Sequence, residues 1–394
     1  MLFQTFDDKQ KCALAYHDKK LVKNLEELNL THTWSYATYL KDLNIEYAQL
    51  WVEGKKLSTV CPSSLQRDLD KAERKIKALI RSCYESKLNL DDICFYDLAP
   101  QSFLKEYAEI KNAICTSIFE RHTKPQNYDH ILNLVKVTTE IRHRSLDLDL
   151  KELQNTTLRD RNIIRGIKNG SNKIQYDPFR TKTGRLATIS NSFPILTLSK
   201  EYRKVVKPTN DWLYELDFNA AELRTVLGLL EHDQPKEDLH DWNIKNLFPE
   251  VKSRDEAKKK IFGWLYNANS SDNKINSIYN RKKIKSLFYK DGQITTPYHR
   301  EIECDDFHAV NYMIQSTAAD LLFEQMYKVW KFLEGKKSFV KFCNHDSIVV
   351  DLAAEDQADV HTIKNIFTQT RFGDFKVSCT GGKNWGAMRK LNIF

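Results

Sequence analysis

The spacing of apolar residues divides the chain into a helical first part and a second part that contains strands. Between residues 64 and 150, apolar side chains recur at every third or fourth position, as an amphipathic helix requires. The clearest run is Leu65, Leu69, Ala72, Ile76, Leu79 and Ile80. Pro125 and the Gln126-Asn127 pair interrupt the pattern, so we expect several helices here rather than one.

Apolar runs after residue 155 predict strands. KIQYDPF (173–179) and WLYELDF (212–218) fit single strands, and FVKFCNHDSIVVDL (339–352) fits a hairpin. Between them, residues 238–290 have a helical spacing. Strands on both sides of a helical insertion predict an α+β fold, in which a second lobe interrupts a sheet-based lobe.

The strand expected at 212–218 carries an acid near its end. Side chains alternate between the two faces of a strand, so one face is apolar and the other contains Glu215 and Asp217. The apolar face comprises Trp212, Tyr214, Leu216 and Phe218, and Leu213 lies on the face of the acids. We expect the apolar face to pack inward and Asp217 to point into open space where a helix begins. An Asp near a helix start is also a common N-cap, and this interpretation of Asp217 stays open.

A second acid stands at the tip of the expected hairpin, where His345 and Asp346 separate two apolar runs. Asp is a frequent turn residue because its side chain bonds nearby backbone amides, so a simple turn is one interpretation. If the hairpin neighbours strand 212–218, however, Asp346 and Asp217 converge at one sheet edge. Like charges this close are unfavourable unless a cation lies between them. Oxygen ligands favour Mg²⁺, and two such ions about 4 Å apart support phosphoryl transfer.

The segment SRDEAKKKIFGWLYNANS (253–270) predicts a helix with an unusual polar face. Residues four positions apart form one stripe, which consists of Arg254, Lys258, Phe262 and Tyr266. A second, apolar stripe consists of Ala257, Ile261, Trp264 and Leu265. The apolar stripe would bury the helix, while the other presents cations suited to a triphosphate and rings suited to a base. An ordinary amphipathic helix with a solvated basic face fits the spacing equally well.

The composition of the chain bears on the number of lobes, the cellular location of the protein and the kind of partner it could bind. The 394 residues exceed the size of a single core, so two or three lobes are expected. The formal charge is +8, and residues 252–290 hold eleven Lys and Arg against three acids, which fits either a solvated face or a polyanion track. No apolar run is long enough to cross a membrane, and no secretory signal is recognised. The eight cysteines form no C-x-x-C pair and no zinc-like cluster with His, so we expect reduced, buried thiols in a cytoplasmic protein.

Five motifs resemble, in the same order, those of family A DNA polymerases, the bacterial polymerase I and phage replicase family. They are TKTGRL (181–186), LDFNAAELR (216–224), RDEAKKKIFGWLY (254–266), NYMIQSTAADL (311–321) and CNHDSIVVD (343–351). The resemblance implies a right-hand α+β fold, with an antiparallel palm sheet and helical fingers and thumb. It also implies a DNA-directed DNA polymerase that adds dNTPs to a primer 3′-hydroxyl by a two-metal-ion mechanism. The implied partners are primer–template DNA and dNTPs.

The resemblance assigns the reaction chemistry to a small group of residues. Asp217, Asp346 and the backbone carbonyl of Phe218 match the ligands of two Mg²⁺ ions, for which Mn²⁺ is an alternative. Arg254 and Lys258 match catalytic residues that bind the triphosphate.

Other matching positions imply contacts with substrate and DNA. His240 stands where the family has a further phosphate contact, and Glu222 matches the acid that blocks a ribose 2′-hydroxyl. Phe262 and Tyr266 match residues that hold the sugar and the nascent base pair. The groups that hold primer and template are matched by Arg185, Asn311, Gln315 and His345.

The resemblance also divides the chain into parts. These are a short N-terminal segment (1–63), a thumb-like helical domain (64–150), a palm in two pieces (151–235 and 301–394) and fingers (236–300). Proofreading exonucleases of the family begin with an Asp-x-Glu motif, which does not occur in this sequence. We therefore expect no intrinsic proofreading exonuclease, with a separate exonuclease subunit or a processivity factor as a further candidate partner. The expected location is the cytoplasm of a bacterium or of a phage-infected host.

The chain departs from the family pattern, which suggests a divergent, phage-like member. Ser347 stands where the family often has Glu after the hairpin Asp, and we expect this to retune metal affinity rather than abolish it. Asn267 replaces a Gly of the family after Tyr266. Two rival functions are a single-subunit RNA polymerase, which lacks the acid matched by Glu222, and a non-catalytic nucleic-acid-binding relative, against which the presence of both aspartates argues.

Overall fold

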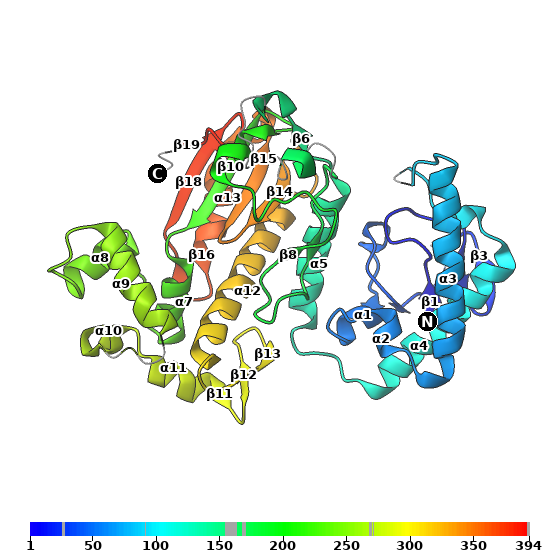
Figure 1. The fold of residues 1–394 in the computed structure, drawn as a ribbon, viewed down its shortest axis with the longest axis horizontal. Helices are drawn as coiled ribbons and strands as arrows, with labels where there is room; N and C mark the ends of the chain where they lie inside the picture. The colour runs from blue at the N-terminus through cyan, green and yellow to red at the C-terminus, as the bar shows by residue number, and fades with distance from the viewer. Residues whose placement is uncertain are drawn as a thin grey trace. The chain divides into compact units, whose positions relative to one another are not determined.

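The computed structural model describes residues 1–25, 28–90, 92–153, 164–167, 171–267, 270 and 272–391. Within them the chain forms two compact units, Met1–His143 and Arg144–Phe394, drawn in Figure 1. The change of pattern expected near residue 155 falls in 154–163, outside the described residues. No helix in the described ranges combines the length and apolar character needed to cross a bilayer.

The first unit begins with a small sheet. Strands β1 (Phe3–Gln4), β2 (Ala15–His17) and β3 (Lys20–Val22) are antiparallel, and β4 (His32–Thr33) pairs in parallel with β5 (Glu46–Tyr47). A parallel bridge from Leu2 to His32 places β4 beside β1. These strands have two or three residues each, too few for an alternating pattern to show in the sequence.

The helices of the first unit confirm the helical pattern of the sequence. They are η1 (Thr38–Leu40), α1 (Ala48–Trp51), α2 (Leu57–Val60), α3 (Ser63–Glu85), η2 (Phe95–Leu98), α4 (Gln101–Arg121) and α5 (Tyr128–His143). Pro125 falls between α4 and α5, as expected of a helix breaker. Leu69 and Ala72 of α3 are buried against residues of α4 such as Leu104 and Ala108, so the periodic stripe does form the core of this unit.

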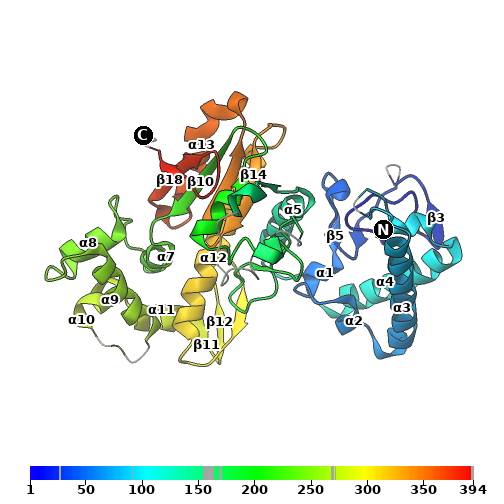
Figure 2. The same cartoon turned by 45° about the horizontal axis from the view of Figure 1, so that its top comes forward.

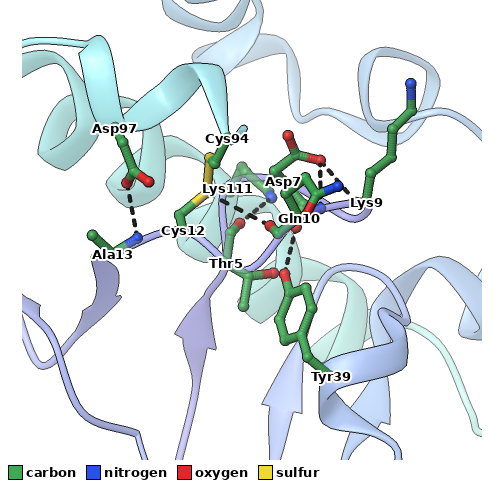
Figure 3. Close-up of a disulfide and its surroundings, with 10 residues drawn as sticks. All are labelled: Thr5, Asp7, Lys9, Gln10, Cys12, Ala13, Tyr39, Cys94, Asp97 and Lys111. Atoms are coloured by element: carbon green, nitrogen blue, oxygen red, sulfur yellow. Dashed lines mark hydrogen bonds between the residues drawn. A yellow bond between two sulfur atoms is a disulfide. The ribbon is translucent and has the colours of Figure 1, made fainter. Parts of the chain in front are cut away.

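The cysteines of the first unit correct one expectation. Cys12 and Cys94 form a disulfide, so the prediction of reduced thiols throughout is wrong for this pair. Figure 3 shows that Ala13 N donates to Asp97 at 2.8 Å beside the disulfide, which joins the loop after β1 to η2. The partners are 82 residues apart, and only the tertiary fold brings them together, so their spacing gave no signal. The other six cysteines are free.

The second unit is built on an antiparallel sheet whose strand order is β14-β15-β10-β18-β19. Strand β10 (Trp212–Phe218) confirms the predicted strand, and β14 (Phe339–Asn344) with β15 (Ser347–Leu352) confirms the hairpin. The outer strands are β18 (Val377–Gly382) and β19 (Arg389–Lys390). Shorter elements are β6 (Asp147–Leu148), η3 (Leu150–Leu153), β7 (Tyr176–Asp177), β8 (Ala187–Thr188), η5 (Lys200–Val205), β9 (Val206–Lys207), β11 (Tyr289–Lys290), β12 (Gln293–Thr295), β13 (Glu301–Glu303), η6 (Ala354–Asp359), β16 (Gln369–Thr370) and β17 (Gly373–Asp374).

Two details of the predicted strands differ. Of the segment 173–179, only the two residues of β7 are strand. In β10, Trp212 is 45% exposed and Leu213 is fully buried, the reverse of the expected faces at this end. Trp385, which donates to Glu215, lies on the face of Leu213 and Glu215, so of the three residues on this face only Asp217 is exposed.

Seven α-helices of the described second unit follow β10. They are α7 (Ala221–Leu229), α8 (Leu239–Asn246), α9 (Arg254–Tyr266), α10 (Asn273–Ile278), α11 (Arg281–Phe288), α12 (Ala309–Phe332) and α13 (Val360–Thr368). Helices α8 to α11 gather in one group away from the strands of the large sheet (Figure 1, Figure 2). The predicted apolar stripe of α9 is buried, with Ala257 and Ile261 inaccessible to solvent.

A buried ion pair ties the start of β10 to the hairpin. Lys341 Nζ lies 2.6 Å from Asp351 Oδ2, and their side chains are 3% and 0% exposed. Asp351 also accepts from the backbone N–H groups of Thr209 and Asn210, at 2.7 and 2.8 Å. The carboxylate therefore fixes the turn that leads into β10, and with it the register of the sheet.

We expect Lys341→Met to lower the free energy of unfolding by about 3 kcal/mol or more, because it leaves the Asp351 charge buried without its cation. Denaturant unfolding followed by circular dichroism measures the loss. Lys337→Met is the matched control, since Lys337 Nζ lies 3.8 Å from the exposed Glu355 and such pairs contribute below about 1 kcal/mol. Equal losses in the two variants would contradict the structural role of the buried pair.

Candidate active site

The register of the sheet brings Asp217 and Asp346 together. Asp217 lies opposite Ser347, and Ser347 directly follows Asp346. Phe218 N donates to the backbone carbonyl of Asp346 at 3.3 Å, which fixes the hairpin tip against the end of β10. Both aspartates line one cavity of about 470 Å³. The expected convergence of the two acids at a sheet edge is thus present.

The local backbone decides between the interpretations that the sequence left open. The residue before α7 is Ala220, in the left-handed region at φ 53°, so Asp217 is not a helix N-cap. His345, at φ 52°, and Asp346 form the hairpin turn. Among the described residues, however, no hydrogen-bond donor contacts the carboxylate of Asp217 or Asp346, so the Asp346 side chain does not stabilise the turn in the usual way.

The electrostatics of the pair are unfavourable. The surrounding protein removes water from Asp217, and together with the nearby charges of Asp346 and Glu215 this raises its pKa to about 7. Desolvation also raises the pKa of Asp346, against the opposing effect of Arg185, His345 and Lys258. The two carboxylates repel each other, and no hydrogen-bond donor among the described residues bonds them. Oxygen ligands of this kind suit a hard divalent cation, which would offset both charges.

Helices α8 and α9 supply the cationic and aromatic wall of the same cavity. Arg254, Lys258, Phe262 and Tyr266 all line it, and so does His240 of α8. The rings of Phe262 and Tyr266 are stacked, with centroids 5.7 Å apart. His240 is 2% exposed, and its Nδ1 is buried without a partner among the described residues. The predicted polar stripe of α9 therefore lines the cavity that contains the two aspartates.

Asp238 is a site residue that the sequence analysis missed. It caps α8 by accepting from the backbone of His240 and Asp241, and it accepts from Asn219 Nδ2 at 2.7 Å. Its carboxylate also forms an ion pair with Arg254, at 3.0 Å. An Asp directly before a helical segment is a recognisable N-cap signal, and it was available in the DLH sequence at 238–240.

Glu222 lies at the junction of the cavity with α9. It is 7% exposed, and it accepts hydrogen bonds from Arg185 and from the Tyr266 hydroxyl. Burial raises its pKa, and the bonds from Tyr266 and Arg185 oppose the shift. Glu222 therefore holds Tyr266 in position.

The position of Arg185 depends on the preceding glycine. Gly184 has φ +74°, and a Cβ there would lie 2.5 Å from the Arg300 guanidinium. Arg300 in turn donates to both carboxylate oxygens of Asp320 on α12, at 2.9 and 2.6 Å. Only glycine allows the TKTGRL segment to approach α12 this closely.

The four residues predicted to contact DNA occupy two adjoining places. Arg185, Gln315 and His345 line a cavity of about 230 Å³ together with Asp346. His345 Nε2 lies 3.1 Å from the carbonyl of Leu196. Asn311, one turn of α12 before Gln315, lines a different cavity of about 400 Å³ that also includes Tyr266. Asn311 Oδ1 is buried and has no partner among the described residues.

The Asp238 contacts predict a pH-dependent contribution to stability. Burial alone would raise the pKa of Asp238, but the hydrogen bonds and charge of Arg254 outweigh it and hold the pKa at about 2. The unfolded value is about 3.9, so the stabilisation is full above about pH 5 and is lost as the pH falls toward 2. We expect Asp238→Asn to lower the free energy of unfolding by about 1–2 kcal/mol at pH 6 and by about half of that at pH 3.

Urea unfolding at the two pH values measures this difference. Asp241→Asn, a change of an exposed acid on the same helix, is the control. A cost for Asp238→Asn that is the same at both pH values would show that the charge of Asp238 does not stabilise the fold.

Comparison with known proteins finds similarity both in sequence and in structure. No protein-family model matches the chain. DNA polymerase I of Borreliella burgdorferi is 23% identical over 346 residues, which cover 73% of this chain and 36% of that protein. The chain thus spans about a third of the length of this relative. The polymerase domain of Pol1 from M. smegmatis, solved with DNA primer–template and dNTP, superposes with a TM-score of 0.60 at 13% identity, over 73% of this chain and 77% of that one.

These similarities bear on the fold and on the family resemblance. The structural match confirms the predicted α+β polymerase fold. The sequence match confirms, at low identity, the resemblance to polymerase I that the five motifs carry. The chain therefore has the fold of the Pol1 polymerase domain over 73% of its length and a sequence similar to that of DNA polymerase I.

Proposed function

We propose that this chain is a DNA-directed DNA polymerase. The observation that carries the proposal is the placement of two unbonded aspartates, Asp217 and Asp346, opposite a helix that presents Arg254 and Lys258 across the same cavity. Negative ligands on one wall and cations on the other suit a metal-bound nucleoside triphosphate. The relatives named above, a DNA polymerase I and a polymerase domain solved with DNA and dNTP, support this choice of substrate.

In the proposed reaction the primer 3′-hydroxyl oxygen attacks the α-phosphorus of a dNTP. A phosphorus–oxygen bond to the primer forms, the bond to pyrophosphate breaks, and the hydroxyl proton passes to water. Asp217, Asp346 and the carbonyl of Phe218 would hold two Mg²⁺ ions, or Mn²⁺ in their place. Such ions activate the attacking oxygen and stabilise the leaving one.

The triphosphate would lie along α9. Arg254 and Lys258 would neutralise its charge, with His240 as a further contact, and charges placed in advance are usually the largest catalytic contribution. The buried, unpartnered Nδ1 of His240 is suited to such a contact. The stacked rings of Phe262 and Tyr266 would then hold the sugar and the nascent base pair.

Primer and template would contact Arg185, Asn311, Gln315 and His345. Amide and cationic side chains at the minor groove meet acceptors that all base pairs share, so they test the shape of the pair rather than its sequence. In the right-hand arrangement, residues 64–150 would be the thumb, 151–235 and 301–394 the palm, and 236–300 the fingers. We further propose cytoplasmic action, with proofreading supplied by a separate exonuclease subunit, and a processivity factor as another partner.

Replacing either aspartate should abolish primer extension. Asp217→Asn and Asp346→Asn each remove one negative ligand while keeping the shape of the side chain, so we expect at least a ~10³-fold loss of the extension rate with Mg²⁺. Primer–template affinity should change little, because neither residue is a cationic phosphate contact. Single-nucleotide extension and fluorescence anisotropy of labelled DNA measure the two quantities. Extension by either variant at near the wild-type rate would refute the assignment of the metal site.

Glu222 should exclude ribonucleotides. Its buried carboxylate lies beneath Tyr266, where an added 2′-hydroxyl would meet it. We expect Glu222→Ala to raise the incorporation of rNTPs relative to dNTPs by about 10-fold or more, in proportion to the lost steric and polar clash. Tyr266→Phe, which removes only the hydroxyl bonded to Glu222, is the matched control. An unchanged ratio in Glu222→Ala would place the sugar discrimination elsewhere and would reopen the RNA polymerase alternative.

A further inference from the structure

The face of the sheet that carries Asp217 holds a third carboxylate, that of Glu215. Glu215 precedes Asp217 by two residues on β10, so both side chains project from the same face, about 7 Å apart along the strand. Opposed residues across the strands form two rows on this face. One row is Asn344, Ser347, Asp217 and Ser378, and the next is Val349, Glu215 and Thr380. The strands that carry these rows lie side by side in Figure 1.

Glu215 is linked to the hairpin that carries Asp346. The buried hydroxyl of Ser347 lies 3.0 Å from Glu215 Oε1 and 3.1 Å from the carbonyl oxygen of Asn344, and it can donate its one proton to either. Trp385 Nε1 donates to the same oxygen at 3.4 Å, and Thr380 Oγ1 donates to Oε2 at 3.5 Å. Since Ser347 directly follows Asp346, its hydroxyl connects the third acid to the hairpin tip.

These hydrogen bonds alone do not require a negative charge. A glutamine at 215 could accept from the same hydroxyl and indole groups through its carbonyl oxygen. A carboxylate adds repulsion instead, because Glu215 projects from the same face of β10 as Asp217, only two residues away. A third negative charge beside two others is favourable only where a cation offsets it.

Two further observations bear on which cation that is. In the row of Ser347 and Asp217, Asn344 is 7% exposed and its Oδ1 is buried. Within the described residues no donor bonds this oxygen, so it is a further candidate to interact with a cation. Arg203 is a protein cation on this side of the sheet, but its guanidinium stacks on Trp385, 4.1 Å from the ring centroid. A bound ion would interact with the acids and the open oxygen together.

We propose that Glu215 is a positioning residue of the divalent-ion site, which supplies from β10 the third negative charge and acts on Asp346 through Ser347. The proposal rests on the polymerase function proposed above. It also accounts for Ser347, where the family often has Glu: in this chain the third acid lies on the neighbouring strand instead. Groups of this kind, which bond the ligands or their neighbours, commonly change metal affinity by 10–100-fold.

Binding of Mn²⁺ to the full chain without DNA or nucleotide tests the proposal. Free Mn²⁺ is quantified by electron paramagnetic resonance during a titration of wild type, Glu215→Gln and the double variant Glu215→Ser with Ser347→Glu. We expect the dissociation constant to rise about 10-fold in Glu215→Gln, which keeps the size and acceptor of the side chain. The double variant moves the acid to the hairpin. Its dissociation constant for Mn²⁺ should lie within about threefold of the wild-type value if the charge, and not the hydrogen bonds, of residue 215 determines affinity.

Glu355→Gln, which removes an exposed acid of the same unit, is the matched control for net charge and should leave Mn²⁺ binding unchanged. Thermal melts establish that each variant folds, and if the double variant does not, Glu215→Gln alone decides. Wild-type affinity in Glu215→Gln would overturn the inference and leave the proposed function intact, with Arg203 as the partner of the acid. Absence of Mn²⁺ binding in wild type would overturn both.

Discussion

Repulsion between two adjoining carboxylates sets the requirements for the rest of the second unit. Asp217 and Asp346 adjoin, and no donor in the described part of the chain bonds their carboxylates, so the fold must hold them there against their mutual repulsion. The packing beneath them provides this. Phe218 stacks on Phe367 with centroids 4.3 Å apart, and β10 is bonded along its length to β15 and β18. A slip of one residue in this register would turn Asp217 to the opposite face, so the apolar side chains fix where the charge stands.

A buried arginine, Arg224, links the end of β10 to the helices that present the cations, α8 and α9. Arg224 is fully buried, and burial lowers its pKa to about 10. It donates to the carbonyls of Asn219, Pro235 and Glu237 at 2.8–2.9 Å, which fixes both the turn after β10 and the loop before α8. The side chain of Asn219 then holds Asp238, and Asp238 holds Arg254. The aspartates and the cations of α9 are therefore positioned by one connected set of hydrogen bonds.

The sequence predicted those parts of this arrangement that repeat over several residues. Strand β10, the hairpin and the buried stripe of α9 each have enough positions for a period to show. The five motifs then gave candidate site residues, several of which line one cavity. Strands of two or three residues, such as β1 and β4, show no period, and the Cys12–Cys94 disulfide depends on a contact 82 residues apart. Asp238 was missed because its importance comes from Asn219 and Arg254, which only the fold brings near it.

The ion pair with Asp238 orders the guanidinium of Arg254. Without such a partner, a side chain proposed to bind a triphosphate would be flexible and solvated, and its immobilisation on binding would cost affinity. Asp238 orients it beforehand, at a position where the carboxylate is itself fixed by Asn219 and by the start of α8. Because Arg254 is still about half exposed, it can contact a phosphate while remaining bonded to Asp238. The negative charge of Asp238 would also weaken the attraction of Arg254 for a phosphate. Binding would then be weaker, but the cation would already be in position.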